Sequence, residues 1–200
     1  MIEVFADVWC PFAYVGLYLV RRRLDAGAPG LALRSRAWPL ELVDGAPMDV
    51  AKTARNIADL RGQLGLDLFD GFNPDTFPST TLPALAVIAA AERSDAALGE
   101  RAALRLRETL FEDGADIGRP DVVAAVAAEL GVTVTPADDQ AVLDDWVEGQ
   151  ARGVKGSPHF FCGDTDVFCP SLSLNRADDG QLRVEIDRSK LEAFLDACSA

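Results

Sequence analysis

The feature that most constrains the fold is a Cys-Pro step placed between a predicted strand and a predicted helix. Residues 2–8 form a short, apolar and β-branched segment, which predicts a buried strand. Pro11 suits the first turn of a helix, and apolar residues recur with helical period across residues 12–24. Cys10 therefore lies where a strand ends and a helix begins, and we expect its sulfur to face unpaired amide N–H groups.

The position of Cys10 favours its thiolate, because the N-terminus of a helix attracts negative charge. The thiolate is the form of cysteine that attacks disulfides and electrophiles. A second interpretation is structural, since free cysteines are commonly small buried hydrophobes. The spacing of these first elements alone leaves both interpretations open.

The rest of the chain changes from strand to helix and back to strand. Residues 31–39 alternate as a strand, which a right-handed crossover would place parallel to the first. Residues 48–150 are rich in Ala, Leu, Arg, Glu and Asp and carry helical periodicity. Two hairpins and a final amphipathic helix follow. The expected later elements are helices at residues 50–64, 82–91, 97–112, 120–130, 136–149 and 189–198, and strands at residues 159–162, 167–169, 172–174 and 182–186, the last two flanking Asp178-Asp179-Gly180.

Charge and hydropathy exclude several classes of partner. The net charge of −13 and the pI near 4.4 argue against nucleic-acid binding, which draws on clustered Lys and Arg. The one dense basic cluster, residues 21–23, is expected to place cations at a helix C-terminus, with specific anion binding as the alternative. The longest apolar stretch, residues 82–91, contains Pro83 and is much shorter than the roughly 20 residues of a membrane span.

The N-terminus and the cysteines indicate the compartment. No basic segment followed by an apolar core precedes the first strand, so no secretion signal is visible. We therefore expect a soluble cytoplasmic protein with no nucleic-acid and no membrane partner. The four cysteines are widely scattered, unlike those of small disulfide-stapled secreted domains. They should rest as thiols in a reducing cytosol. The sequence leaves the oligomeric state open.

A second motif, Gly-Val-Lys-Gly-Ser-Pro at residues 153–158, comes directly before the strand pattern returns. Two glycines and a turn that ends in Ser-Pro favour a cis peptide bond at Pro158. A trans turn is also compatible with the sequence.

Together the two motifs resemble the DsbA-like branch of the thioredoxin superfamily. The segment Asp-Val-Trp-Cys-Pro-Phe-Ala-Tyr at residues 7–14 resembles the active-site segment of its cytosolic members. These are the FrnE-type oxidoreductases, the 2-hydroxychromene-2-carboxylate isomerases and the kappa-class glutathione transferases. The resemblance implies an α/β thioredoxin fold with a mixed central sheet and a large all-helical insertion. Its implied domains are a discontinuous thioredoxin-like domain at residues 1–45 and 150–200 and a helical insertion domain at residues 46–149.

The resemblance also implies roles for single residues. Cys10 corresponds to the nucleophile, Pro158 to the cis-proline beside it, and the backbone of Ser157 to the edge that pairs with a bound thiol peptide. The hydroxyl of Ser157 is expected near the sulfur. Ala13 is a departure, because dithiol members carry there a second cysteine that resolves the mixed disulfide. A lone Cys10 would hold its mixed disulfide until an external thiol, glutathione or mycothiol, arrives. An engineered replacement of that second cysteine is an alternative origin of Ala13.

Neighbouring side chains complete the expected substrate site. Pro11 and Phe12 follow the nucleophile directly, and Trp9 and Tyr14 are expected to form an aromatic wall. His159 follows the proposed cis-proline and would either hydrogen-bond near the nucleophile or, by strand alternation, point away from it.

The remaining polar and sulfur-bearing residues each allow two interpretations. Asp7 would act as a proton relay below the thiol or be held by backbone N–H groups. Cys162 and Cys169 share a parity on adjacent strands and form either a redox pair or two apolar core residues. Cys198 is expected to be a partly exposed thiol without a role. No zinc-binding spacing is present, so neither a metal nor a permanently bound cofactor is expected.

Three functions remain. The leading hypothesis is a single-cysteine thiol–disulfide oxidoreductase that acts on a disulfide-containing protein or on a small thiol or electrophile. The second is a thiol-dependent isomerase or transferase, although the resembling enzymes of that kind usually carry serine at the position of Cys10. The third is a non-catalytic thioredoxin-fold binding module, against which the retained Cys10 and the intact turn at residues 153–158 argue.

Overall fold

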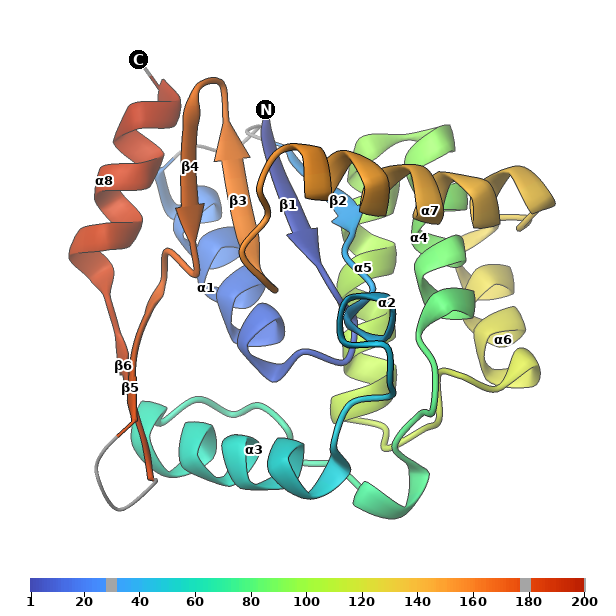
Figure 1. Ribbon diagram of the computed structural model, residues 1–200, viewed down its shortest axis with the longest axis horizontal. Helices are drawn as coiled ribbons and strands as arrows, with labels where there is room; N and C mark the ends of the chain where they lie inside the picture. The colour runs from blue at the N-terminus through green and yellow to red at the C-terminus, as the bar shows by residue number, and fades with distance from the viewer. Residues whose placement is uncertain (28–31, 177–180, 200) are drawn as a thin grey trace.

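A central sheet with helices on both of its sides forms the framework of the protein (Figure 1). The computed structural model describes residues 1–27, 32–176 and 181–199. Its elements in chain order are β1 (Ile2–Ala6), α1 (Pro11–Gly27), β2 (Leu33–Ala37), α2 (Leu40–Asp44), α3 (Val50–Leu64), the 3₁₀ turn η1 (Pro74–Thr76), α4 (Leu82–Ser94), α5 (Ala96–Phe111), α6 (Pro120–Leu130), α7 (Pro136–Ala151), β3 (His159–Cys162), β4 (Thr165–Phe168), β5 (Leu172–Arg176), β6 (Leu182–Ile186) and α8 (Arg188–Ser199).

The strand order determines which loops meet at the end of the sheet. Within the described residues, the central sheet has four strands in the order β2-β1-β3-β4. β1 pairs in parallel with β2, from Ile2 opposite Leu33 to Ala6 opposite Ala37, and it pairs antiparallel with β3. β5 and β6 form a separate two-stranded sheet, and β6 packs against α3. The central sheet is therefore mixed, as the sequence predicts.

Local sequence explains where the helices of the middle segment begin and end. Asp49 caps α3 by accepting a hydrogen bond from the backbone N–H of Lys52 at 2.9 Å, and Gly65 ends that helix in the left-handed conformation. Pro120 begins α6 and Gly131 ends it in the same way. The predicted ranges of both helices are confirmed. None of the helices in the described ranges is long and apolar enough to cross a bilayer.

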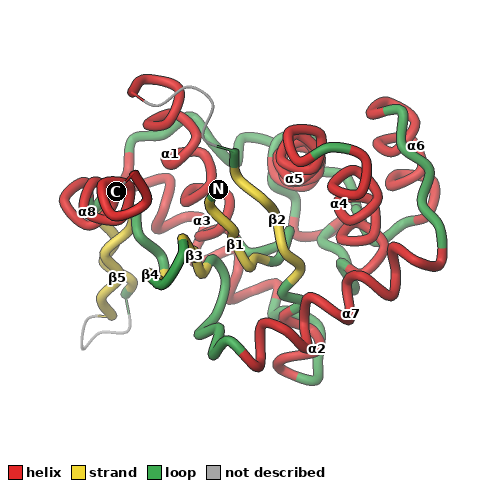
Figure 2. The backbone as a smooth tube through the Cα atoms, turned by 90° about the horizontal axis from the view of Figure 1, so that it is seen from above, coloured by secondary structure: helices red, strands yellow, loops and turns green. Residues whose placement is uncertain are grey.

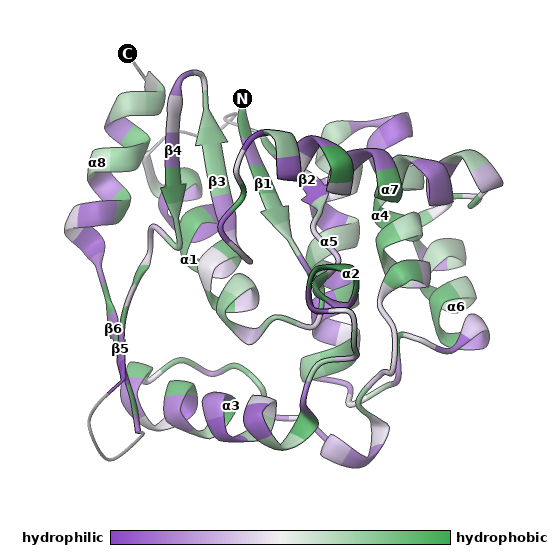
Figure 3. Ribbon diagram, viewed as in Figure 1, coloured by the Kyte–Doolittle hydropathy of each residue, from purple (hydrophilic) through white to green (hydrophobic). Residues whose placement is uncertain are grey.

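Helices cover both faces of the sheet (Figure 2). α1 and α8 lie over one face, where Phe160 of β3 and Phe194 of α8 belong to the same hydrophobic cluster. α7 crosses the other face, where Trp146 packs against Phe5 and Trp38. Figure 3 shows that β1 and β3 are mostly hydrophobic, whereas α3 and α7 mix hydrophobic with hydrophilic residues. The two central strands are thus buried on both faces, and the helices around them are amphipathic.

The largest hydrophobic cluster crosses the predicted domain boundary. It joins Trp9 and Val15, near the start of the chain, to buried residues of α4 and α5. It also contains Leu172 and Val184 of the small two-stranded sheet. The helical segment and the thioredoxin-like part therefore share one continuous core. The division at residues 45/46 and 149/150 stays a prediction.

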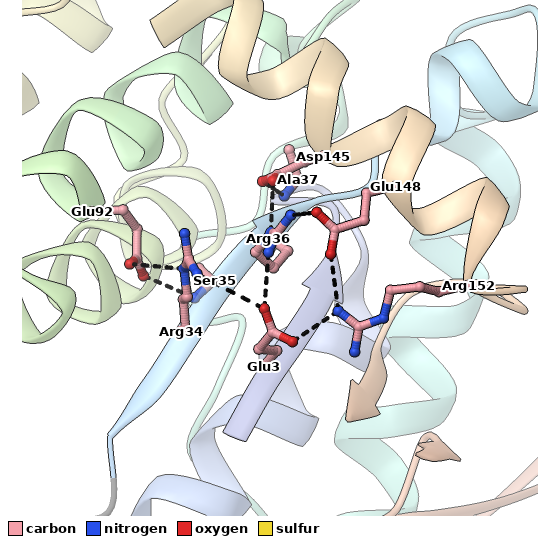
Figure 4. Close-up of polar contacts among 9 residues, drawn as sticks. All are labelled: Glu3, Arg34, Ser35, Arg36, Ala37, Glu92, Asp145, Glu148 and Arg152. Carbon is pink, nitrogen blue, oxygen red and sulfur yellow. Dashed lines mark hydrogen bonds and ion pairs between the residues drawn. The ribbon is translucent and has the colours of Figure 1, made fainter. Parts of the chain in front are cut away.

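An ion-pair network holds α7 to the sheet (Figure 4). Arg36 of β2 is nine-tenths buried and pairs with Glu3 of β1 and with Asp145 and Glu148 of α7. The Nε atom of Arg36 lies 2.6 Å from the Asp145 carboxylate, and Arg152 bridges Glu3 and Glu148. Because Arg36 is largely removed from water, its three carboxylate partners are needed to stabilise it. The network explains how a helix with many charges packs on the sheet.

The structure differs from the sequence-based elements mainly at segment ends. β1 stops at Ala6, because the backbone N–H of Asp7 bonds to a side chain outside the sheet. β4 begins two residues earlier than predicted, because a tight turn with Gly163 in the left-handed conformation precedes it. The short helix α2 was not predicted, since five residues carry too little periodicity. The predicted turn at residues 178–180 and the start of the predicted strand at residue 31 lie outside the described residues.

Candidate active site

Cys10 directly precedes α1, so its sulfur lies at the N-terminus of that helix. Its carbonyl oxygen accepts the first helical hydrogen bond, from the backbone N–H of Tyr14 at 3.1 Å. The backbone N–H groups of Ala13 and Phe12 hydrogen-bond to the sulfur and lower the pKa of the thiol. The thiol is almost fully buried and donates to the carbonyl oxygen of Ser157 at 3.1 Å. The sulfur therefore meets both the helix amides and the second sequence motif.

Ser157 and Pro158 place the second motif against the first. The peptide bond between them is cis. The Oγ atom of Ser157 accepts a hydrogen bond from the backbone N–H of Asp7 at 2.9 Å. Pro158 packs against α1 at Gly16, where a Cβ atom would lie 3.2 Å from the proline Cγ. Two segments that are 147 residues apart at the Cys10–Ser157 contact thus build one site.

A pocket of about 450 Å³ opens beside Cys10. Pro11, Phe12 and Ser157, all expected in the substrate site, line it together with Cys10. The sequence did not assign the opposite wall, which comes from the segment after β2, the first turns of α3 and the end of β5. This wall consists of Leu40, Asp44, Pro47, Met48, Asp49, Lys52, Thr53, Asn56 and Arg176. The pocket offers a bound molecule apolar surface and both signs of charge.

The electrostatics of Cys10 correct the expected preference for the thiolate. Burial raises the pKa of the thiol, and the nearby carboxylate of Asp7 also raises it. The Ser157 side chain and the backbone N–H groups of Ala13 and Phe12 lower the pKa, but by less than burial raises it. The helix N-terminus acts in the expected direction, and the loss of water outweighs it. The thiol is therefore protonated at neutral pH.

Two buried charged residues lie beneath the Cys10 thiol. The carboxylate of Asp7 accepts a hydrogen bond from the backbone N–H of Leu40 at 2.6 Å, and burial raises its pKa to about 6. The guanidinium of Arg107, on α5, donates to the backbone carbonyls of Asp7 at 3.0 Å and Ala103 at 2.6 Å. Burial lowers the pKa of Arg107 to about 10, against the attraction of Asp7 and Cys10. The cation therefore favours the ionised forms of both groups.

The sequence did not single out Arg107. The sequence nevertheless carried a signal for this residue. Arg107 lies on the apolar face of α5, one turn after Ala103 and one turn before Phe111, and all three side chains are buried. Arginine is rarely buried without a partner, so this position pointed to a buried anion. Asp7 is held by backbone N–H groups, which agrees with one of the two interpretations of that residue.

Trp9 and Tyr14 do not line the pocket beside Cys10, so the expected aromatic wall is corrected. Trp9 is fully buried, and its ring stacks on that of Phe77 with centroids 6.0 Å apart. Tyr14 lies one turn into α1 on the side that faces α5, where it stacks on Phe111 at 5.4 Å and meets Phe69 edge-on. Burial raises the pKa of the Tyr14 phenol. Both rings belong to the core.

His159 also points away from Cys10. Its ring packs on Phe161, with centroids 4.5 Å apart, on the face of β3 opposite to Phe160. The Nδ1 atom accepts from the backbone N–H of Lys155 at 3.1 Å, so Nε2 carries the proton and donates to Asp166 at 2.8 Å. Burial lowers the pKa of the imidazole. The structure agrees with the strand-alternation alternative, and His159 does not line the pocket beside Cys10.

All four cysteines are free thiols, and their positions exclude one of the two interpretations that the sequence allowed for Cys162 and Cys169, the redox pair. Cys162 ends β3, whereas Cys169 lies beyond β4, where its backbone N–H donates to the carbonyl of Pro158 at 3.0 Å. Cys162 pairs with Thr165, and Cys169 lies four strand residues beyond Thr165, on the order of 13 Å away, so the redox-pair interpretation of Cys162 and Cys169 is wrong. Burial and then the Cys10 thiol raise the pKa of Cys169 to about 12. The described residues hold no group of three or more His, Cys, Asp or Glu side chains suited to a metal ion.

A family model for the DSBA-like thioredoxin domain matches residues 1–178 of the chain. Because this match covers most of the sequence, the chain belongs to the DSBA-like thioredoxin domain family. The resemblance drawn from the two motifs and the α/β thioredoxin fold with a mixed sheet are thereby confirmed. No curated protein matches the chain.

Solved structures share the fold at low sequence identity. The cytosolic disulfide reductase DsbM from Pseudomonas aeruginosa has a TM-score of 0.60 and 16% identity, with 98% of this chain and 97% of that chain covered. The structure of DsbM with GSH has a TM-score of 0.59, 14% identity and the same coverage. A 2-hydroxychromene-2-carboxylate isomerase has a TM-score of 0.59 and 18% identity, with 84% and 87% covered. The fold is thus common to oxidoreductases and isomerases.

Proposed function

We propose that the chain is a thiol–disulfide oxidoreductase that works through the single thiol of Cys10. One observation carries this proposal: Cys10 is the one cysteine among the described residues that lines the pocket beside the Ser157 backbone. The position of Ala13 supports a monothiol mechanism, because that residue is fully buried behind Cys10 and supplies no second thiol. Membership of the DSBA-like family and the likeness to the reductase DsbM support the reaction class.

The proposed reaction has two exchanges. The Cys10 thiolate attacks one sulfur of a bound disulfide, the S–S bond breaks, and the leaving thiolate takes up the proton that Cys10 lost. The backbone N–H groups of Phe12 and Ala13 and the Ser157 side chain stabilise the thiolate as it forms. An external thiol then attacks the substrate sulfur of the mixed disulfide, and the bond from that sulfur to Cys10 breaks. The released Cys10 thiolate takes up the proton of the external thiol, and the external thiol and the substrate half leave joined as a new disulfide.

A low-molecular-weight thiol is the proposed co-substrate, with no permanently bound cofactor. Glutathione is favoured, because a DsbM structure with GSH has the same fold over nearly the whole chain, and mycothiol is the alternative. In the pocket, Lys52 and Arg176 offer positive charge to carboxylates, and Asp44 and Asp49 offer negative charge to an ammonium group. The likeness to a cytosolic reductase supports a cytoplasmic location.

Steady-state reduction of a small-molecule disulfide by glutathione tests the proposal. Removal of the nucleophile in Cys10→Ser and Cys10→Ala should lower kcat/KM by at least roughly 10³-fold. Cys169→Ala is the matched control, because it removes another buried thiol from the same end of the sheet, and it should leave the rate unchanged. Equal rates in the wild type and in both Cys10 variants would contradict the proposal.

A glutathione-dependent isomerase or transferase is a second candidate, and the raised pKa of Cys10 favours it. A protonated thiol that donates a hydrogen bond, as Cys10 does to Ser157, could donate to the sulfur of a bound glutathione instead. Serine can make the same bond but cannot form a mixed disulfide. Calorimetry would therefore show that Cys10→Ser still binds glutathione and Cys10→Ala does not. Two results together would favour the oxidoreductase over the isomerase or transferase. Cys10→Ser would lose turnover, and the wild type would carry a glutathione adduct on Cys10.

A further inference from the structure

The thiols of Cys162 and Cys198 lie side by side, away from the pocket at Cys10. Cys162 is the last residue of β3, and Cys198 lies in the last turn of α8. Their thiols contact each other, and neither is part of a disulfide. Both residues are half-buried, whereas Cys10 and Cys169 are buried. The pair is therefore open to a small reagent from solvent.

The backbone places these two cysteines together. Phe160 of β3 and Phe194 of α8 pack edge to face, with ring centroids 6.0 Å apart. Cys162 is two strand residues beyond Phe160, on the same face and about 7 Å further along. Cys198 is four helix residues beyond Phe194, again on the same face and about 6 Å further along. β3 and α8 run in the same direction (Figure 1), so the two cysteines meet one step beyond the aromatic pair.

The surroundings of the two thiols are mainly apolar. Both pack against the cluster that contains Leu191 and Leu195 of α8. Burial raises the pKa of Cys198 to about 12, and its contact with Cys162 also raises it. The positive charge of the N-terminal amine lowers this pKa. The pair therefore lies near the N-terminus, at the edge of the sheet where β1 begins. Each thiol therefore has the other as a direct neighbour.

We propose that Cys162 and Cys198 are a second redox site, a dithiol that a small disulfide converts to an intramolecular disulfide between α8 and β3. One cysteine attacks the small disulfide, whose S–S bond breaks, and the first small thiol leaves with the proton of that cysteine. The other cysteine attacks the mixed disulfide, forms the Cys162–Cys198 bond, and releases the second small thiol with its own proton. The two cysteines lose two electrons, and the small disulfide gains them.

The bond would stabilise the position of α8. Phe194 and Leu195 of α8 share a hydrophobic cluster with Ala13 and Leu17 of α1. A covalent link from α8 to β3 would keep this face covered even when the last helix would otherwise separate from the sheet. The redox state of the pair would then set the stability of the C-terminal segment.

Peptide mapping of the full chain tests the proposal. The Cys10→Ser variant is incubated with oxidised glutathione, alkylated and digested with trypsin, so that the pocket thiol does not consume the reagent. We expect a cross-link between the peptides of residues 156–176 and 191–200. Because the first peptide contains two cysteines, the cross-link should persist when Cys169→Ala is added and disappear when Cys162→Ser is added. Separate glutathione adducts on the two cysteines, free thiols at both, or a cross-link through Cys169 would overturn it.

Thermal unfolding gives a second readout. Oxidation of the Cys10→Ser protein should raise Tm by roughly 5–10 °C, the range for one added cross-link in a chain of this size. The further variant Cys198→Ser should show no rise. An equal Tm for oxidised and reduced protein would overturn the stabilising role. Because Cys10 is absent from both tests, their failure leaves the proposed function untouched, and failure of the Cys10 assays leaves this proposal untouched.

Discussion

Cys10 and the Cys162–Cys198 pair lie at opposite ends of the β1–β3 ladder, and their surroundings differ. Cys10 follows the C-terminal end of β1, is almost fully buried, and has helix amides, Ser157 and the buried charges of Asp7 and Arg107 around it. Cys162 and Cys198 lie at the end where β1 begins, are half-buried, and have mainly apolar neighbours.

The difference shows that polar surroundings and a partner thiol are separate properties of a thiol site. The Cys10 site has the hydrogen bonds that stabilise a thiolate but no neighbouring thiol on its helix, where Ala13 stands. The other site has the neighbouring thiol but few polar groups. We therefore expect exchange with an external thiol at the first site and internal disulfide formation at the second.

Loss of the aromatic pair should have the largest effect on the apolar site. Phe160→Ala removes a fully buried ring that packs on α8, and the free energy of unfolding should fall by about 3–5 kcal/mol in urea denaturation. Phe168→Ala, on the neighbouring strand and 37% exposed, is the matched control and should lose about 1 kcal/mol or less. Equal losses would show that α8 is not held through this face.

Loss of the buried cation should have the largest effect on the polar site. Arg107→Met removes the cation that faces Asp7 and Cys10, and unfolding at pH 7.5 should become easier by about 3 kcal/mol. The loss should be smaller at pH 5, where Asp7 is protonated. Arg105→Met, on the exposed side of the same helix, removes only surface ion pairs and should change stability by less than about 1 kcal/mol. A loss that does not depend on pH would rule out the charge interaction.

The pH dependence of stability should show the buried carboxylate directly. The pKa of Asp7 is about 6 in the folded state, above its unfolded value of 3.8. Its protonated form therefore stabilises the fold below pH 4, and this contribution disappears as the pH rises through 6. Relative to Asp7→Asn, the wild type should lose about 2–3 kcal/mol between pH 4 and pH 7 in urea titrations. A constant difference between the two proteins would contradict the assignment.

The smallest of these effects concerns the reactivity of Cys10. Because its pKa is raised, alkylation by iodoacetamide should accelerate about tenfold per pH unit from pH 6 to about 8.5, without a plateau. Asp7→Asn should make alkylation faster at a given pH, since the carboxylate raises the pKa of Cys10. Free glutathione in the same buffer is the control. A plateau below pH 7 would show that the thiolate already prevails.

The sequence predicted those features that depend on neighbours along the chain. The strand–Cys10–helix order, the capped helix α3 and the hairpin of β3 and β4 all follow from local pattern and turn residues. The contact between Cys10 and Ser157 was expected only from the family resemblance. The two residues are 147 positions apart, and hydrophobic periodicity reports local structure alone.

The missed features depend on burial and on distant packing. The helix N-terminus suggested a thiolate at Cys10, but the loss of water on burial could not be read from the sequence. The sequence allowed the His159 side chain to point toward Cys10 or away from it. Its hydrogen bonds to Lys155 and Asp166 show that it points away. Cys198 was assigned no partner, because its contact with Cys162 depends on how α8 docks.

The central claim is that Cys10 works without an internal resolving thiol. Its most direct test is a mixed disulfide between Cys10 and a chromophoric thiol, freed of excess reagent, with release of the chromophore followed over time. We predict no release from the protein alone and a release rate proportional to the glutathione concentration when glutathione is added. Release that is independent of glutathione, together with a new disulfide from Cys10 to Cys169, would contradict the claim.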